Sequence, residues 1–136
     1  MIVVFDTSVV VEALFWPRST ARRALTGLAL RRFKTAVSQE ILDEYAAVTA
    51  ELRARRFPQA QPSGALAWIA AKSVRVEALP LRGKLSRDPT DNVFVASAAA
   101  AHAAFLVTQD RELLVLQKPF GVQVVTPAQL IQALQL

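Results

Sequence analysis

Short apolar segments alternate along the chain with segments of helical periodicity. The first of them, Ile2–Phe5, has four apolar residues without polar alternation, which is typical of a parallel strand buried on both faces. The segment around residue 76 instead alternates apolar and polar positions, as a strand with one solvated face does. Strands are predicted at residues 2–5, 34–37, 74–78, 105–108 and 122–125.

Apolar residues three and four positions apart predict the helices between these strands. Residues 19–32 show this spacing, with arginines on the other faces. Thr7 and Ser8 are suited to cap the first helix, and Thr126 followed by proline opens the last. Helices are predicted at residues 7–15, 19–32, from 38 into the basic group 53–56, 65–72, 89–104, 111–116 and after 126.

Helices that alternate with short apolar strands predict a three-layer α/β/α sandwich with a mainly parallel sheet of about five strands. Residues 58–64, rich in Gln and Pro, are interpreted as a loop because the segments on either side are too small to hold separate cores. The polar stretch 82–88 is predicted to be a surface loop. We therefore expect residues 1–136 to form a single domain.

Composition narrows the chemistry available to such a domain. Without cysteine and with His102 as the single histidine, the chain has no disulfide framework or thiolate metal site and little scope for histidine-based catalysis. A net charge of +5 favours polyanionic partners, nucleic acid first. The N-terminus lacks the pattern of a signal peptide, and the longest apolar stretch, 93–107, is interrupted and too short for a membrane span. These features predict a soluble, cytoplasmic protein without a membrane partner.

Two acids follow predicted strands at the carboxyl edge of the sheet, where such folds bind ligands. Asp6 comes directly after 2–5, and a lone carboxylate at that position loses hydration and needs a compensating partner. A helix cap is the simpler explanation, but Thr7 and Ser8 could cap the helix without burying a charge, so we interpret Asp6 as functional. Asp110 follows another strand, with an N-cap of the next helix as an equally good explanation.

The predicted helices contribute two further acids. Glu44 lies at the edge of the apolar face of its helix and is well placed to face a cleft, whereas Glu40, in the first turn, is the second choice. Asp91 also lies in a first turn, where the helix dipole favours any acid. It shares a face with Phe94 and Val95, which turns it toward the core.

Carboxylates gathered at one edge would repel one another and raise one another's pKa. Divalent cations would remove this conflict. An all-oxygen ligand set, without Cys or His, fits Mg²⁺ or Mn²⁺ rather than zinc. The chemistry that such a site supports is phosphoryl transfer, with water attacking phosphorus.

Four segments in this order resemble the PIN-domain nucleases, and among them the VapC-like toxin components of toxin–antitoxin operons. The segments are VVFDTS (3–8), SQEILDEYAAV (38–48), RDPTDNVF (87–94) and LVTQD (106–110). No single motif is specific, but the order and spacing of all four are. The resemblance runs from residue 2 to about 126 and implies a PIN-like domain that binds Mg²⁺ or Mn²⁺ and cuts single-stranded RNA.

Carried over residue by residue, the resemblance implies that the catalytic and metal-binding residues are Asp6, Glu44, Asp91 and Asp110. Some relatives have an acid at the position of Asn92, so either Asp91 or Asn92 faces the metal. Arg111, beside Asp110, is the basic residue that we expect nearest to a scissile phosphate. Further auxiliary candidates are Thr7, Ser8, Glu40 and Asp88.

The net charge and the resemblance each predict binding partners for this chain. Basic clusters at 22–23, 31–34, 53–56 and 82–87 are either solvated surface or a rim that holds RNA. The resemblance implies a cognate antitoxin protein and a homodimer. Apolar residues of the first two helices, such as Phe15, Trp16 and Leu28, belong either to that interface or to the core.

The leading hypothesis is therefore a metal-dependent endoribonuclease, the toxin of a type II toxin–antitoxin pair. The alternative is a catalytically degenerate PIN module that binds RNA or a protein partner without cutting. A phosphatase of the haloacid dehalogenase type also places an Asp after its first strand. The pattern of that family requires a second Asp where this chain has Ser8, so this hypothesis ranks below the other two.

Overall fold

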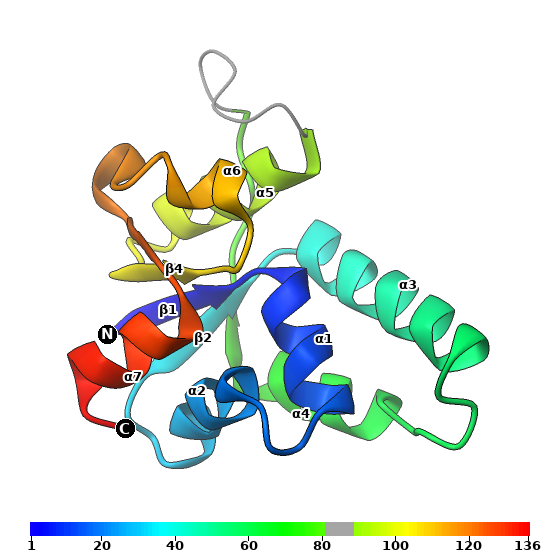
Figure 1. The fold of residues 1–136 in the computed structure, drawn as a ribbon. Helices are drawn as coiled ribbons and strands as arrows, with labels where there is room; N and C mark the ends of the chain where they lie inside the picture. The colour runs from blue at the N-terminus through cyan, green and yellow to red at the C-terminus, as the bar shows by residue number, and fades with distance from the viewer. Residues whose placement is uncertain (81–88) are drawn as a thin grey trace.

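A single sheet of five parallel strands, in the order β3-β2-β1-β4-β5, forms the centre of the computed structural model (Figure 1). The structure describes residues 1–80 and 89–136, without the side chains of residues 89–91. The strands are β1 (Ile2–Phe5), β2 (Lys34–Val37), β3 (Ser73–Arg75), β4 (Phe105–Val107) and β5 (Gln123–Val125). The predicted parallel sheet is confirmed.

Helices cover both faces of this sheet. In Figure 1, α5 and α6 lie on one side, and α1, α2, α4 and α7 lie on the other. Accordingly, α5 packs on β1, β2 and β4, while α4 packs on β2 and β3. The helices are α1 (Thr7–Phe15), α2 (Thr20–Ala29), α3 (Gln39–Arg55), α4 (Ser63–Lys72), α5 (Pro89–Ala100), α6 (Arg111–Leu114) and α7 (Pro127–Leu134), with a 3₁₀ turn η1 (Pro119–Gly121). The predicted three-layer sandwich is confirmed.

Two helices end earlier than their periodicity predicts, because each stops in a left-handed residue that is not glycine. The residue is Arg31 (φ 58°), two positions after α2, and His102 (φ 53°), two positions after α5. In both places the next N–H bonds back across the turn: Arg32 donates to Gly27 O at 2.9 Å, and Ala103 to Ala98 O at 2.9 Å. These are Schellman-type ends, which sequence patterns signal mainly when glycine is present.

Buried polar contacts hold α3 and α5 against the end of β1. The Tyr45 hydroxyl of α3 donates to the carbonyl of Phe5, the last residue of β1. Ser97 of α5 donates to Ser38, the N-cap of α3, at 3.1 Å. Since all four residues are buried, the carboxyl edge of the sheet is fixed in place from both sides.

The apolar residues that we assigned either to a homodimer interface or to the core divide between the two surroundings. Phe15 and Leu28 are buried in the core, whereas Trp16 is 38% exposed.

In the part of the chain that the structure describes, no helix has the length and apolar character needed to cross a membrane.

Several arginines of the basic clusters bind backbone carbonyls. Arg22 donates to Ala13 O at 3.2 Å, and Arg53 donates to Ala60 O at 2.6 Å. Ala13 lies in the last turn of α1, where carbonyls lack helical partners, and Ala60 lies in the loop between α3 and α4. These two arginines therefore have structural contacts of their own, whatever else they bind.

Gly27 should not tolerate alanine, although alanine usually favours a helix. A Cβ at this position of α2 would overlap the ring of Phe33, which is itself buried and packed 5.8 Å from the ring of Phe5. We expect Gly27→Ala to lower the free energy of unfolding by about 1–3 kcal/mol, as overpacking does, when measured by chemical denaturation.

Gly64→Ala, in α4, is the matched control, because a Cβ there meets no atom within 4 Å. It should leave stability unchanged or raise it by up to about 1 kcal/mol. Equal stability of the two variants would contradict the packing argument.

Candidate active site

Strand β1 delivers Asp6 to the carboxyl edge of the sheet, at the point where the strand order reverses between β1 and β4. The Asp6 N–H donates to Val107 O at 2.9 Å, which extends the pairing of β1 with β4 by one residue. The side chain is only 7% exposed. Parallel α/β sheets bind their ligands at this place.

Asp6 is also the N-cap of α1, so the expectation that Thr7 or Ser8 would cap this helix is wrong. The Asp6 Oδ1 accepts from the Thr7 N–H at 2.8 Å, and Thr7 is the first helical residue. The exposed Ser8 hydroxyl instead donates to Asp6 Oδ2 at 3.0 Å. A carboxylate is a better acceptor than a hydroxyl for the positive end of a helix, and capping does not prevent a functional role.

Thr108 connects Asp6 to Asp110, a link that the sequence interpretation missed. Its hydroxyl donates to Asp6 Oδ2 at 2.7 Å and accepts from the Asp110 N–H at 3.0 Å. Thr108 is fully buried directly after β4. The signal was present in the sequence as a threonine two positions before Asp110, but a hydroxyl between two acids gives no indication of which acid it will contact.

The pKa of Asp6 is raised above its ordinary value. Burial is the main cause, and the nearby negative charge of Asp110 raises the pKa further. The hydrogen bonds from Thr108, Ser8 and the Thr7 N–H lower it, but they do not offset the loss of hydration. The site therefore favours anything that brings positive charge to Asp6.

Glu44 of α3 contributes negative charge around Tyr45. The pKa of Tyr45 is raised well above its ordinary value by burial and then by the negative charges of Asp6 and Glu44. Glu44 is half-buried, whereas Glu40 is exposed. Of the two glutamates considered from the sequence, Glu44 is the less exposed, and it lies beside Tyr45, whose pKa the charge of Asp6 also raises.

The remaining candidates lie around this centre. Asp110 is half-buried and caps α6, where its Oδ1 accepts from the Glu112 N–H at 2.9 Å, so the capping explanation is correct and the residue is also coupled to Asp6. Arg111 is exposed, and Asn92 is half-buried. Asp91 belongs to α5, but its side chain lies outside the described part of the structure, and Asp88 lies outside it altogether.

The described side chains, which do not include those of Asp88 and Asp91, contain no group of three or more acids or histidines close enough to hold a metal ion. Asp6 and Asp110 nevertheless fit a divalent cation. Their donors are all oxygen, they repel each other, and burial has already raised the pKa of Asp6. Hard cations such as Mg²⁺ and Mn²⁺ prefer these ligands.

A model of the PIN domain family matches residues 2–112, and the chain belongs to this family, whose members are generally nucleases. No curated protein sequence matches the chain. Two solved structures share its fold with a TM-score of 0.61 each. One is a chain of VapBC2 from Rickettsia felis, solved bound to a DNA fragment from its promoter, with 15% identity over 93% of this chain and 98% of that one. The other is PAE2754 from Pyrobaculum aerophilum, with 20% identity over 98% of this chain and 88% of that one.

Replacing Asp6 by Asn tests whether its charge opposes folding. Because its pKa is raised from 3.8, the folded protein holds the proton more tightly than the unfolded chain, so wild-type stability falls as pH rises from about 4 through the pKa of the folded state. Asp6→Asn avoids this loss. In chelator at pH 7 it should melt at a higher temperature than wild type, and the difference should shrink as the pH falls below about 4.

Asp43→Asn is the control for this measurement, because Asp43 is an exposed carboxylate of α3. Its effect should stay within about 0.5 kcal/mol at both pH values. An Asp6→Asn protein that is less stable than wild type by the same amount at both pH values would show that the hydrogen bonds, and not the charge, decide the stability of this edge.

Proposed function

We propose that residues 1–136 form a single PIN-like domain that acts as a metal-dependent endoribonuclease on single-stranded RNA. The observation that carries the proposal is the link from Asp6 through Thr108 to Asp110 at the point where the strand order reverses. Membership of a family of nucleases supports the same function. The net charge of +5 suits a polyanionic substrate.

The proposed metal ligands are Asp6, Glu44, Asp91 and Asp110. When bound, Mg²⁺ or Mn²⁺ would supply Lewis-acid activation of water and of the scissile phosphodiester. For Asp91 rather than Asn92, the support is that Phe94 and Val95, three and four positions on, are both buried.

The side chains around these acids have distinct tasks in the proposed reaction. Ser8 and Thr108 donate to Asp6 Oδ2 and so hold its carboxylate in one orientation. The Thr7 hydroxyl is buried without a hydrogen-bond partner in the described structure, so Ser8, which is exposed, is the hydroxyl that we place next to substrate. Arg111 is exposed beside Asp110, where it would contact an RNA phosphate.

We also propose that this protein is the toxin of a type II toxin–antitoxin pair in the cytoplasm, partnered by an antitoxin and by a second copy of itself. The support is the VapBC2 assembly from Rickettsia felis, one chain of which shares the fold. Since that chain is 15% identical, the partner has to be tested directly, by copurification with the product of the neighbouring reading frame.

The ribonuclease activity is tested by cleavage of a single-stranded RNA in Mg²⁺ or Mn²⁺. Wild type should cleave, chelator should stop it, and Asp6→Asn and Asp110→Asn should each slow it by at least about 100-fold, because each removes a proposed metal ligand. Mn²⁺ should also raise the melting temperature of wild type more than that of Asp6→Asn. Undiminished cleavage by Asp6→Asn would refute the assignment, whereas RNA binding without any cleavage would favour the degenerate module.

The assignment of Glu44 is tested against its neighbour on the same helix. Glu44→Gln should slow cleavage by about 10-fold or more, because Glu44 is half-buried and is a proposed metal ligand. Its charge, like that of Asp6, raises the pKa of Tyr45. Glu40→Gln, at an exposed position one turn earlier, should stay within about twofold of wild type. The reverse order of effects would exchange the roles of the two glutamates.

A further inference from the structure

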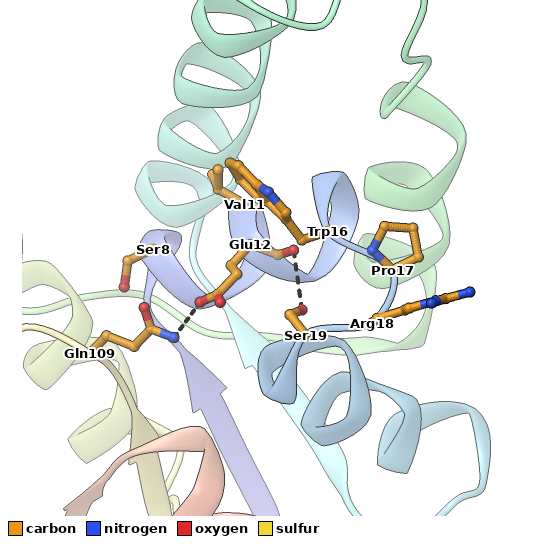
Figure 2. A pocket seen from close by; sticks show the side chains of 8 residues that line it. All are labelled: Ser8, Val11, Glu12, Trp16, Pro17, Arg18, Ser19 and Gln109. Carbon is orange, nitrogen blue, oxygen red and sulfur yellow. Dashed lines mark hydrogen bonds between the residues drawn. The ribbon is translucent and has the colours of Figure 1, made fainter.

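A pocket of about 960 Å³ adjoins the candidate active site on the side of α1 (Figure 2). Two lining residues connect it to the carboxylates. Ser8 lines the pocket and donates to Asp6 Oδ2, and Gln109 lines it between Thr108 and Asp110. A polymer that passes over Asp6 and Asp110 therefore meets this pocket next.

Inside the pocket, Glu12 of α1 fixes the side-chain amide of Gln109. The Gln109 Nε2 donates to Glu12 Oε2, and Figure 2 shows this bond with the amide oxygen on the side of Ser8. An ionised carboxylate only accepts hydrogen bonds, so the amide must turn its NH₂ toward Glu12. This bond fixes the orientation of the amide, so the positions of its acceptor oxygen and of its second N–H donor are fixed for a ligand in the pocket.

Trp16 supplies an aromatic surface to the same pocket. It is 38% exposed, and its ring is held edge-to-face against Phe57 at 5.3 Å between centroids. The Arg56 guanidinium lies 5.6 Å from the centroid of the Trp16 ring, and Arg18 also lines the pocket. An aromatic ring with one guanidinium over it and a second lining the same pocket suits a nucleobase and its phosphate, since bases stack on aromatic rings and guanidinium planes and cations meet the backbone.

We propose that this pocket binds the nucleobase next to the scissile phosphodiester and selects adenine there. Trp16 provides the stacking surface, and Gln109 reads the base, accepting from the adenine amino group and donating to its ring nitrogen, the pairing that glutamine makes with adenine. Glu12 is a positioning residue that keeps the amide in this orientation. The proposal rests on the proposed ribonuclease function and adds a substrate preference to it.

The preference is measured by cleaving a single-stranded RNA pool with randomised bases and sequencing the ends. Wild type should favour adenine beside the cut by about five- to tenfold, the factor that a lost base contact costs. Gln109→Ala should reduce this preference to below about twofold while cleavage of the other sequences continues. Gln132→Ala, at an exposed position of α7, is the matched control and should keep the wild-type profile.

Glu12→Gln separates a positioning role from a merely structural one. An amide at position 12 donates as well as accepts, so the Gln109 amide gains both orientations. The variant should lose most of the adenine preference without losing its fold, as judged by circular dichroism and melting temperature. A base profile unchanged in both Gln109→Ala and Glu12→Gln would overturn the proposal.

Stacking on Trp16 is measured without cleavage, by tryptophan fluorescence of Asp6→Asn protein titrated with oligoadenylate and oligouridylate. The chain has two tryptophans, Trp16 and Trp68. Quenching, stronger with oligoadenylate, should disappear in Asp6→Asn/Trp16→Phe. It should persist in Asp6→Asn/Trp68→Phe, which alters the half-buried tryptophan of α4.

The two measurements separate failure of the pocket from failure of the proposed function. The pocket proposal alone is overturned if wild-type cleavage depends on Asp6 but the base profile is unaffected by Gln109→Ala and the quenching is unaffected by Trp16→Phe. This is also the result expected if a protein segment occupies the pocket instead of RNA. If neither wild type nor any variant cleaves RNA, the proposed function is contradicted. The quenching measurement then tests base binding in the pocket independently of cleavage.

Discussion

The carboxylate of Asp6 is buried, and its hydrogen bonds do not offset the loss of hydration. This unfavourable charge is the constraint on which the carboxyl edge of the sheet depends. β1 is flanked by β2 and β4, and Asp6, the first residue after it, is only 7% exposed. Three hydrogen bonds hold the carboxylate, yet its pKa stays raised because burial outweighs them and Asp110 adds repulsion. Natural proteins keep such unfavourable charges mainly where they are used.

The same edge is held together by a second buried contact, from α3. Tyr45 donates to the carbonyl of Phe5, one residue before Asp6, and thereby fixes the turn of α3 that also carries Glu44. The contact between Ser38 and Ser97 ties the start of α3 to α5 in the same way. Packing of the fold and placement of the acids are therefore not separable here, since buried polar networks specify one arrangement when all their members are satisfied.

Sequence patterns predicted β1 and β2 to the residue, and each strand ends directly before a polar residue, Asp6 or Ser38, that caps the next helix. They missed the ends of α2 and α5, where Arg31 and His102 take the left-handed conformation without a glycine to announce it. Helical spacing predicted that Glu44 lies nearer than Glu40 to the apolar face of α3, and Glu44 is accordingly half-buried while Glu40 is exposed. Contacts such as Glu12 to Gln109, which join positions 97 apart, depend on strand order, and periodicity does not contain that information.

The hydrogen bonds of Asp6 also decide which of its atoms is available for a ligand. A carboxylate oxygen has two acceptor positions. In the described structure Oδ2 receives both the Ser8 and the Thr108 hydroxyl, while Oδ1 receives only the Thr7 N–H. Oδ1 is therefore the oxygen with acceptor capacity left. A cation at this edge would bind Asp6 through this oxygen, and Asp110, whose negative charge already acts on Asp6, would supply a second carboxylate.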